Sequence, residues 1–120
     1  MGTIRNRVVI VHHWDLGKIN SLREDAIKTF QETADSFNYR LFSVENNMVT
    51  PIMTGFANTE YTFFINGECS KLRWEESDLF QEVRKMWCKK HKNEASNILI
   101  VDFGQDTPAS VKEYSYIEED

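Results

Sequence analysis

The sequence predicts an α+β fold in which two helices cover a mostly antiparallel sheet, in the ferredoxin-like (split βαβ) two-layer arrangement. Three observations lead to this prediction: two amphipathic helical patterns far apart in the chain, apolar runs near both ends, and short extended stretches with turn residues in the middle. The resulting order is β-α-β-(β)-β-(β)-α-β. The main rival is a small mixed three-layer sheet, because the first and last strands are apolar throughout. Two layers are favoured because only two helices are available to cover the sheet.

The first elements are a strand and a long helix. Residues 8–11 (VVIV) form an uninterrupted β-branched run, which predicts a central strand buried on both faces. A loop is expected over residues 15–20. Ser21 and Glu24 match a capping box, so the helix is expected to begin there. Apolar residues recur at intervals of three and four through about residue 37, which predicts one buried stripe.

Extended segments are expected after this helix. Residues 39–44 alternate enough to form a strand, and the two asparagines at 46–47 are typical of a turn. A second extended stretch covers residues 48–53. Pro51 cannot donate a ladder hydrogen bond, so this stretch is expected at a sheet edge or a bulge.

A hairpin is expected in the second half of the middle region. Residues 60–65 (EYTFFI) are rich in β-forming side chains and lead into Asn66-Gly67. This dipeptide favours a two-residue hairpin turn because both positions tolerate a positive φ. Residues 69–73 are then the expected return strand.

A second helix and one or two strands complete the fold. Residues 75–92 have a helical apolar pattern with acidic residues at its start and lysines at its end. This charge distribution is favourable for the helix dipole at both termini. Residues 97–103 (NILIVDF) form a second continuous apolar strand. Residues 111–117 are expected to add a short edge strand, and residues 118–120 an acidic frayed tail.

Length and composition indicate one domain over residues 1–120. A chain of this length with 41% apolar residues is large enough to bury a core without disulfides or a structural metal. Its two cysteines form no CxxC pair. The N-terminal apolar run is too short for a signal sequence or a membrane span, so a cytoplasmic location without a membrane partner is expected. No cofactor is predicted.

The charge balance favours some partners over others. Nineteen acidic and fourteen basic side chains give a net charge of −5. Binding to duplex nucleic acid requires a basic face, so this partner is disfavoured. A protein with a basic surface fits the charge better, because opposite charges steer association.

Two clusters at strand ends are weak candidates for chemistry. His12, His13 and Asp15 follow the first strand, where a histidine beside a carboxylate could act as a general base or a metal ligand. Asp102 and Asp106 flank a glycine at the end of the last apolar strand and could hold a divalent ion. Ordinary core packing and turn chemistry are the favoured explanations of both clusters. In the ferredoxin-like arrangement the two strands are antiparallel, so the clusters should lie at opposite ends of the sheet.

Other residues suggest an interface or an anion site. Trp74 precedes the second helix, and Tyr114 and Tyr116 share one face of the expected last strand, as is common for interface anchors. Free sheet edges also favour pairing between subunits, so a homodimer is possible. Basic residues that could contact phosphate are Arg23, Arg40, Arg73 and the run Lys89-Lys90-His91-Lys92.

Three functions follow from these observations. The leading interpretation is a small acidic binding protein, not an enzyme, that inhibits or sequesters a basic-surfaced partner. The alternative is a homo-oligomer that binds a small phosphorylated ligand or nucleotide. A third is a metal-assisted hydrolase that uses His12 or His13 with Asp15.

Overall fold

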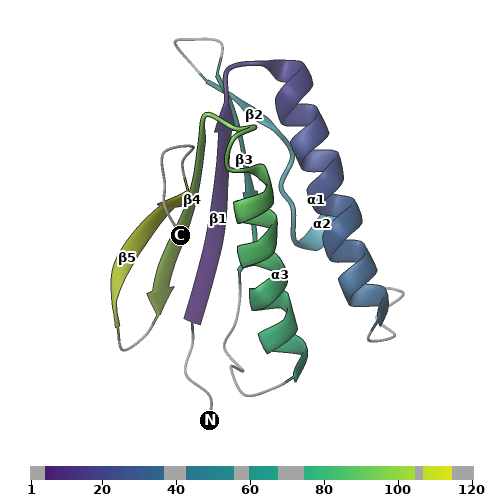
Figure 1. Cartoon of the computed structure of the whole chain (residues 1–120), viewed down its shortest axis with the longest axis vertical. Helices are drawn as coiled ribbons and strands as arrows, with labels where there is room; N and C mark the ends of the chain where they lie inside the picture. The colour runs from purple at the N-terminus through teal and green to yellow at the C-terminus, as the bar shows by residue number, and fades with distance from the viewer. Residues whose placement is uncertain (1–4, 37–42, 56–59, 68–74, 105–106, 115–120) are drawn as a thin grey trace.

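The computed structural model describes residues 5–36, 43–55, 60–67, 75–104 and 107–114. Within them lie a five-stranded antiparallel sheet and three helices (Figure 1). The strands are β1 (Arg5–His13), β2 (Met53–Thr54), β3 (Tyr61–Ile65), β4 (Asn97–Gly104) and β5 (Thr107–Tyr114). The helices are α1 (Leu16–Ser36), α2 (Val44–Asn47) and α3 (Glu75–His91). The predicted α+β class is confirmed, with one more short helix than expected.

The strand order of the sheet is β2-β3-β1-β4-β5. β1 lies in the centre, pairing antiparallel with β3 on one side and β4 on the other. Val11, for example, is opposite Phe63 on β3 and Ile98 on β4. The prediction of a central first strand is confirmed, and β2 and β5 form the edges.

The core lies between one face of the sheet and the two long helices, which cover the same side (Figure 1). Val9 and Val11 of β1 are fully buried there, against Phe30 of α1 and Phe63 of β3. Burial of side chains of this size contributes about 1.5–3 kcal/mol each. The prediction that β1 is buried on both faces is wrong, because Val8 and Ile10 point the other way and are only half-buried.

Helix α1 begins earlier than predicted. It starts at Leu16, and residues 16–20 are helical instead of forming a loop. Asp15 is the reason: its Oδ1 accepts a hydrogen bond from the Lys18 amide at 3.0 Å, and its carbonyl oxygen accepts one from the Ile19 amide. Asp15 therefore occupies the N-cap position that the sequence pattern assigned to Ser21.

The region around Val44 also differs from the prediction. Val44, expected to end a strand, begins α2, and the asparagines expected in a turn lie inside this helix. The Ser43 hydroxyl caps it by accepting a hydrogen bond from the Asn46 amide at 3.2 Å. The Val44 amide donates to Gln31 Oε1, which attaches α2 to α1.

The C-terminal half agrees more closely with the prediction. α3 and β4 match the expected ranges within one residue, and β5 begins four residues before the predicted edge strand. The expected segments at 39–42 and 69–73 and the tail at 118–120 lie outside the described residues. None of the helices described is long and apolar enough to cross a membrane.

Candidate functional site

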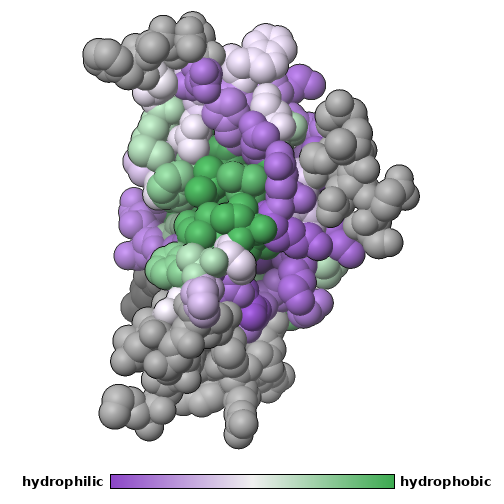
Figure 2. All heavy atoms as spheres, turned by 90° about the vertical axis from the view of Figure 1, so that its left-hand side faces the viewer, coloured by the Kyte–Doolittle hydropathy of each residue, from purple (hydrophilic) through white to green (hydrophobic). Residues whose placement is uncertain are grey.

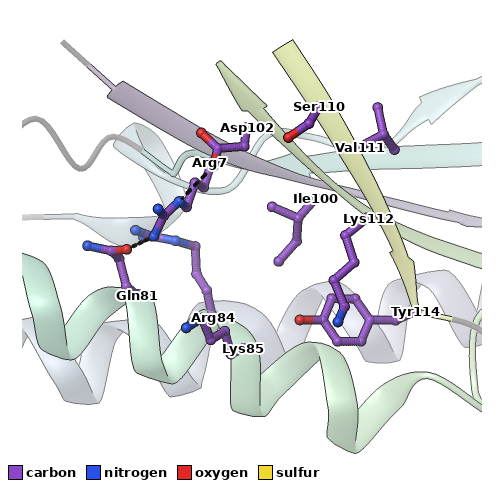
Figure 3. A pocket seen from close by; sticks show the side chains of 10 residues that line it. All are labelled: Arg7, Gln81, Arg84, Lys85, Ile100, Asp102, Ser110, Val111, Lys112 and Tyr114. Carbon is purple, nitrogen blue, oxygen red and sulfur yellow. Dashed lines mark hydrogen bonds and ion pairs between the residues drawn. The ribbon is translucent and has the colours of Figure 1, made fainter. Parts of the chain in front are cut away.

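A cavity opens between α3 and the strands β4 and β5, on the face of the sheet that carries the helices (Figure 3). Its volume is about 270 Å³, which is near the lower end of the range for small-molecule sites. The charged and amide side chains around it are Arg7, Gln81, Arg84, Lys85, Asp102 and Lys112. The cavity is thus small, with charged or amide side chains on several sides and apolar groups between them.

Side chains from one side of α3 form one wall of the cavity. Gln81, Arg84 and Lys85 occupy positions i, i+3 and i+4 of α3, so they project from the same side of the helix. Arg84 is only 2% exposed. The guanidinium of such a buried arginine lies beneath the protein surface, where it interacts more strongly with other charges than it would in water.

Side chains from β1, β4 and β5 form the opposite wall of the cavity. Arg7 of β1 is opposite Asp102 of β4, which in turn is opposite Ser110 of β5. Ile100 and Lys112 form the next pair with the same orientation. Because side chains two apart in a strand share a face, all of these residues border the cavity.

Hydrogen bonds hold Arg7 at one end of the cavity. Its Nε donates to Asp102 Oδ2 at 3.2 Å, and its Nη1 donates to Gln81 Oε1 (Figure 3). These contacts join β1, β4 and α3 through one guanidinium. The orientation of Arg7 is therefore set before any ligand binds.

Lys112 and Tyr114 border the opposite end. Both extend from β5 toward α3, with Ile100 nearby on the neighbouring strand (Figure 3). The Lys112 Nζ lies 5.1 Å from the centroid of the Tyr114 ring, within reach of a cation–π interaction. Ile100 and the ring give this end an apolar wall.

The charge balance is the most distinctive feature of the cavity. Among the described lining residues, four cations face one carboxylate, a formal surplus of three positive charges in a protein of net charge −5. No family model, curated protein or solved structure matches the chain. The function is therefore inferred from this charge balance and the geometry around it.

The predicted histidine cluster has a structural role in the described contacts. The Asp15 amide donates to His13 Nδ1 at 2.8 Å, which closes the turn between β1 and α1. His12 points to the opposite face, where its Nε2 lies 2.8 Å from Glu60 Oε1. The two histidines therefore do not share a site, and the metal-assisted hydrolase remains an untested prediction.

The contact of His13 predicts a pH dependence. Burial lowers the pKa of His13 below its usual 6.5, although the nearby Asp15 carboxylate acts in the opposite direction. Protonation would also break the hydrogen bond that Nδ1 accepts. This contribution to stability should be complete above pH 6.5 and decline as the pH falls toward the lowered native pKa. An NMR titration of the His13 ring should give a midpoint below 6.5; a midpoint at or above 6.5 would contradict this assignment.

Only one of the two aspartates in the second predicted cluster is among the described residues. Asp102 borders the cavity as the partner of Arg7, whereas Asp106 lies outside the described residues. Within the described part of the chain, no three His, Cys, Asp or Glu side chains are placed together to hold a metal ion. The two clusters lie at opposite ends of the antiparallel β1–β4 pair, as predicted: His12 is opposite Asn97, and Arg7 is opposite Asp102.

The predicted binding residues do not come together in one site in the described part of the chain. Tyr114 is 4% exposed and lines the cavity instead of projecting from the surface. Arg23 Nε donates to the Thr50 carbonyl oxygen at 2.8 Å, which attaches α1 to the segment before β2. The others lie outside the described residues: Trp74, Tyr116, Arg40 and Arg73.

The cations at the end of α3 lie away from the cavity. His91 is 5% exposed; its Nε2 is 2.8 Å from Asp25 Oδ2, and its Nδ1 is 3.0 Å from Glu94 Oε1. Trp87 Nε1 also donates to Asp25 Oδ2 at 2.9 Å. This part of the predicted phosphate-binding run therefore joins α3 to α1.

Sequence reasoning missed the four cations of the cavity: Arg7, Arg84, Lys85 and Lys112. A partial signal was present for Arg7, which has the same alternation phase as the core residues Val9 and Val11. A charged residue in phase with a buried face indicates a polar site at the margin of the core. The signal does not identify the other members of the site.

Proposed function

We propose that this protein binds a small phosphorylated ligand in the cavity between α3 and β5. The observation that carries the proposal is the concentration of four cations around about 270 Å³ in an otherwise acidic chain. Like charges repel, and the described carboxylates closest to these cations are Asp102, which pairs with Arg7, and Glu82, 3.8 Å from the Lys85 Nζ. A bound anion would further reduce the repulsion among the cations.

The side chains divide between two parts of such a ligand. Arginine forms paired hydrogen bonds to phosphate oxygens, and lysine adds a point charge, so Arg7, Arg84 and Lys85 suit the phosphate. Ile100 and the Tyr114 ring suit a small organic group, with Lys112 between the two ends. The volume favours a phosphomonoester such as a sugar phosphate over a dinucleotide.

The fold assignment can also be made more specific. β1 lies in the sheet between β3 and β4, which are the two strands that α3 connects. A strand inserted between the two strands of such a unit is the feature that defines a split βαβ motif. This supports a ferredoxin-like arrangement with β5 added at the edge.

Inhibition or sequestration of a basic-surfaced partner stays a prediction. Two of its proposed aromatic anchors, Trp74 and Tyr116, lie outside the described residues, and the third, Tyr114, is buried in the cavity. The geometry therefore favours the small phosphorylated ligand over the protein partner.

Thermal melting at constant ionic strength tests the proposal. Inorganic phosphate and ribose 5-phosphate are the probes, with ribose and chloride as controls. A ligand at about a hundred times its Kd should add about 2.7 kcal/mol to the free energy of unfolding. A rise in Tm with the phosphorylated probes alone is expected. The absence of any rise would contradict the proposal.

Charge variants then locate the site. Replacing Lys85 and Lys112 together by glutamine should weaken phosphate binding by about tenfold, or about 1.4 kcal/mol. Lys89→Gln is the matched control, because Lys89 is an exposed lysine of α3 that does not line the cavity. Isothermal titration of each variant measures the difference. An equal loss in the control would show that phosphate responds to overall charge and not to this cavity.

A further inference from the structure

The cations that border the cavity lie at both of its ends. Figure 3 shows Arg84 of α3 extending toward the guanidinium of Arg7, so these two side chains lie together at one end. Lys112 borders the other end, where it and Tyr114 extend from β5. A ligand that fills the cavity therefore meets a positive charge at each end.

The spacing between the two ends follows from the strand register. Arg7, Asp102 and Ser110 form one row across β1, β4 and β5, and Lys112 belongs to the next row on the same face. Two residues of a strand span about 6.6 Å. An anion bound beside Arg7 and a second group that pairs with Lys112 are thus separated by the length of a small molecule.

Strand alternation decides which charged residue of β5 reaches the cavity. Figure 2 views the molecule from the side on which β5 lies and shows hydrophobic residues gathered beside hydrophilic ones. Val111 and Glu113 point away from the helices, whereas Ser110 and Lys112 border the cavity. Glu113 instead accepts a hydrogen bond from the Asn97 amide at 3.0 Å. The carboxylate next to Lys112 in the chain is therefore directed to the other face.

None of the described carboxylates forms an ion pair with Lys112. Asp102, the one carboxylate among the described lining residues, binds Arg7 at 3.2 Å. Lys112 contacts the Tyr114 ring, whose centroid is 5.1 Å from the Nζ atom. An anionic group of a ligand would supply the counter-charge that Lys112 lacks in the described part of the chain.

The charge of the lining residues matches a ligand with two different anionic groups. Four cations and one carboxylate leave a formal surplus of three positive charges. Glu82 lies 3.8 Å from the Lys85 Nζ, but it does not line the cavity, and water screens such an exposed pair. A phosphate monoester carries about two negative charges near neutral pH, and a carboxylate adds one. Together these charges equal the surplus, whereas two phosphates would exceed it.

We propose that the ligand of this cavity is a phosphorylated carboxylic acid. Its phosphate lies between Arg7 and Arg84, because guanidinium groups form paired hydrogen bonds to phosphate oxygens, and its carboxylate pairs with Lys112. The carbon chain between the two groups packs against Ile100 and the Tyr114 ring. This inference rests on the phosphate site proposed above and adds the second anionic group.

Isothermal titration with 3-phosphoglycerate and glycerol 3-phosphate tests the proposal at constant ionic strength near neutral pH. The two compounds differ in a single group, because a carboxylate in the first replaces a hydroxymethyl group in the second. We expect 3-phosphoglycerate to bind about tenfold more tightly, since its carboxylate pairs with Lys112. Glycerate, which has the carboxylate but no phosphate, should bind more weakly than either compound.

Charge variants connect this preference to Lys112. Lys112→Gln should weaken the binding of 3-phosphoglycerate about fivefold more than the binding of glycerol 3-phosphate. Lys89→Gln is the matched control, because it removes the same charge from an exposed lysine that does not line the cavity. This control should keep the preference. Lys112 is exposed, so its variant should retain the circular dichroism spectrum of the parent protein.

The titrations distinguish a failure of the carboxylate contact from a failure of the phosphate site. Equal affinities for the two phosphorylated compounds, or a preference that Lys112→Gln leaves unchanged, would overturn the carboxylate contact and leave the phosphate site in place. Failure of both compounds to bind would overturn the phosphate site and the carboxylate contact together.

Discussion

Replacing Gly67 with alanine is expected to lower the free energy of unfolding by about 3 kcal/mol or more. A Cβ at this position would lie 1.8 Å from the Arg7 carbonyl oxygen and 2.1 Å from its carbonyl carbon, and both are backbone atoms of the central strand. The Arg7 amide also donates to the Gly67 carbonyl oxygen at 2.8 Å. Chemical denaturation of the purified variant measures the loss.

Gly17→Ala is the matched control for this substitution. The nearest atom to its Cβ would be Asp15 Oδ1 at 3.3 Å, the end of a half-buried side chain and not a backbone atom. Alanine also restricts the unfolded chain and favours helix, so the change should stay within about 1 kcal/mol of the parent protein. Similar stabilities for the Gly67→Ala and Gly17→Ala variants would contradict the close approach of Gly67 to β1.

Asp25→Asn is expected to lower the free energy of unfolding by about 1–3 kcal/mol at pH 7. Asp25 Oδ2 accepts from Trp87 and lies 2.8 Å from the buried His91 ring, so it joins α1 to α3. The amide of asparagine would lose the charge that strengthens both contacts. Asp35→Asn on the same helix is the control, because Asp35 is exposed and contacts only Gln31 in the described hydrogen bonds.

The effect of Asp25→Asn should depend on pH. Burial acts to raise the pKa of Asp25, but the hydrogen bonds from His91 and Trp87 outweigh it and hold the pKa below 3.8. A lowered native pKa stabilises the fold above pH 3.8, and this contribution disappears as the pH falls through the native value. The parent protein and the Asp25→Asn variant should therefore converge in stability as the pH falls below 3.8 and through the lowered native pKa of Asp25. A difference in stability that persists unchanged after Asp25 is protonated would show that it does not come from the carboxylate charge.

Local patterns in the sequence predicted most of the strands and helices. The β-branched run of β1 and the stripe of α1 each repeat with the period of one element, so no distant contact is needed to recognise them. The start of α1 was missed because Asp15 and Ser21 are both suitable caps. Ile19 decides between them: it is fully buried, and the helix must begin before it to bring its side chain into the core.

The cavity could not be predicted in the same way, because its members come from four elements. Arg7 meets Gln81 and Asp102 across 74 and 95 positions of the chain. Such separations contain no spacing that a sequence pattern can reveal. The candidates that the sequence did suggest were groups of neighbours, such as His12, His13 and Asp15, whose described contacts mainly serve a turn, a cap and a cross-strand pair.

The alternation of β5 has a consequence for how this protein can diverge in sequence. Val111 points away from the helices and the adjacent Lys112 borders the cavity, and the β4–β5 ladder already contains a register shift between Asp102 and Gly104. Sliding β5 by one residue against β4 would exchange these faces, placing a lysine among apolar side chains and a valine beside the arginines. A slide of two residues would keep each side chain on its own face. A change in the length of the β4–β5 connection is therefore compatible with the cavity only where it leaves this register unchanged or shifts it by an even number of residues.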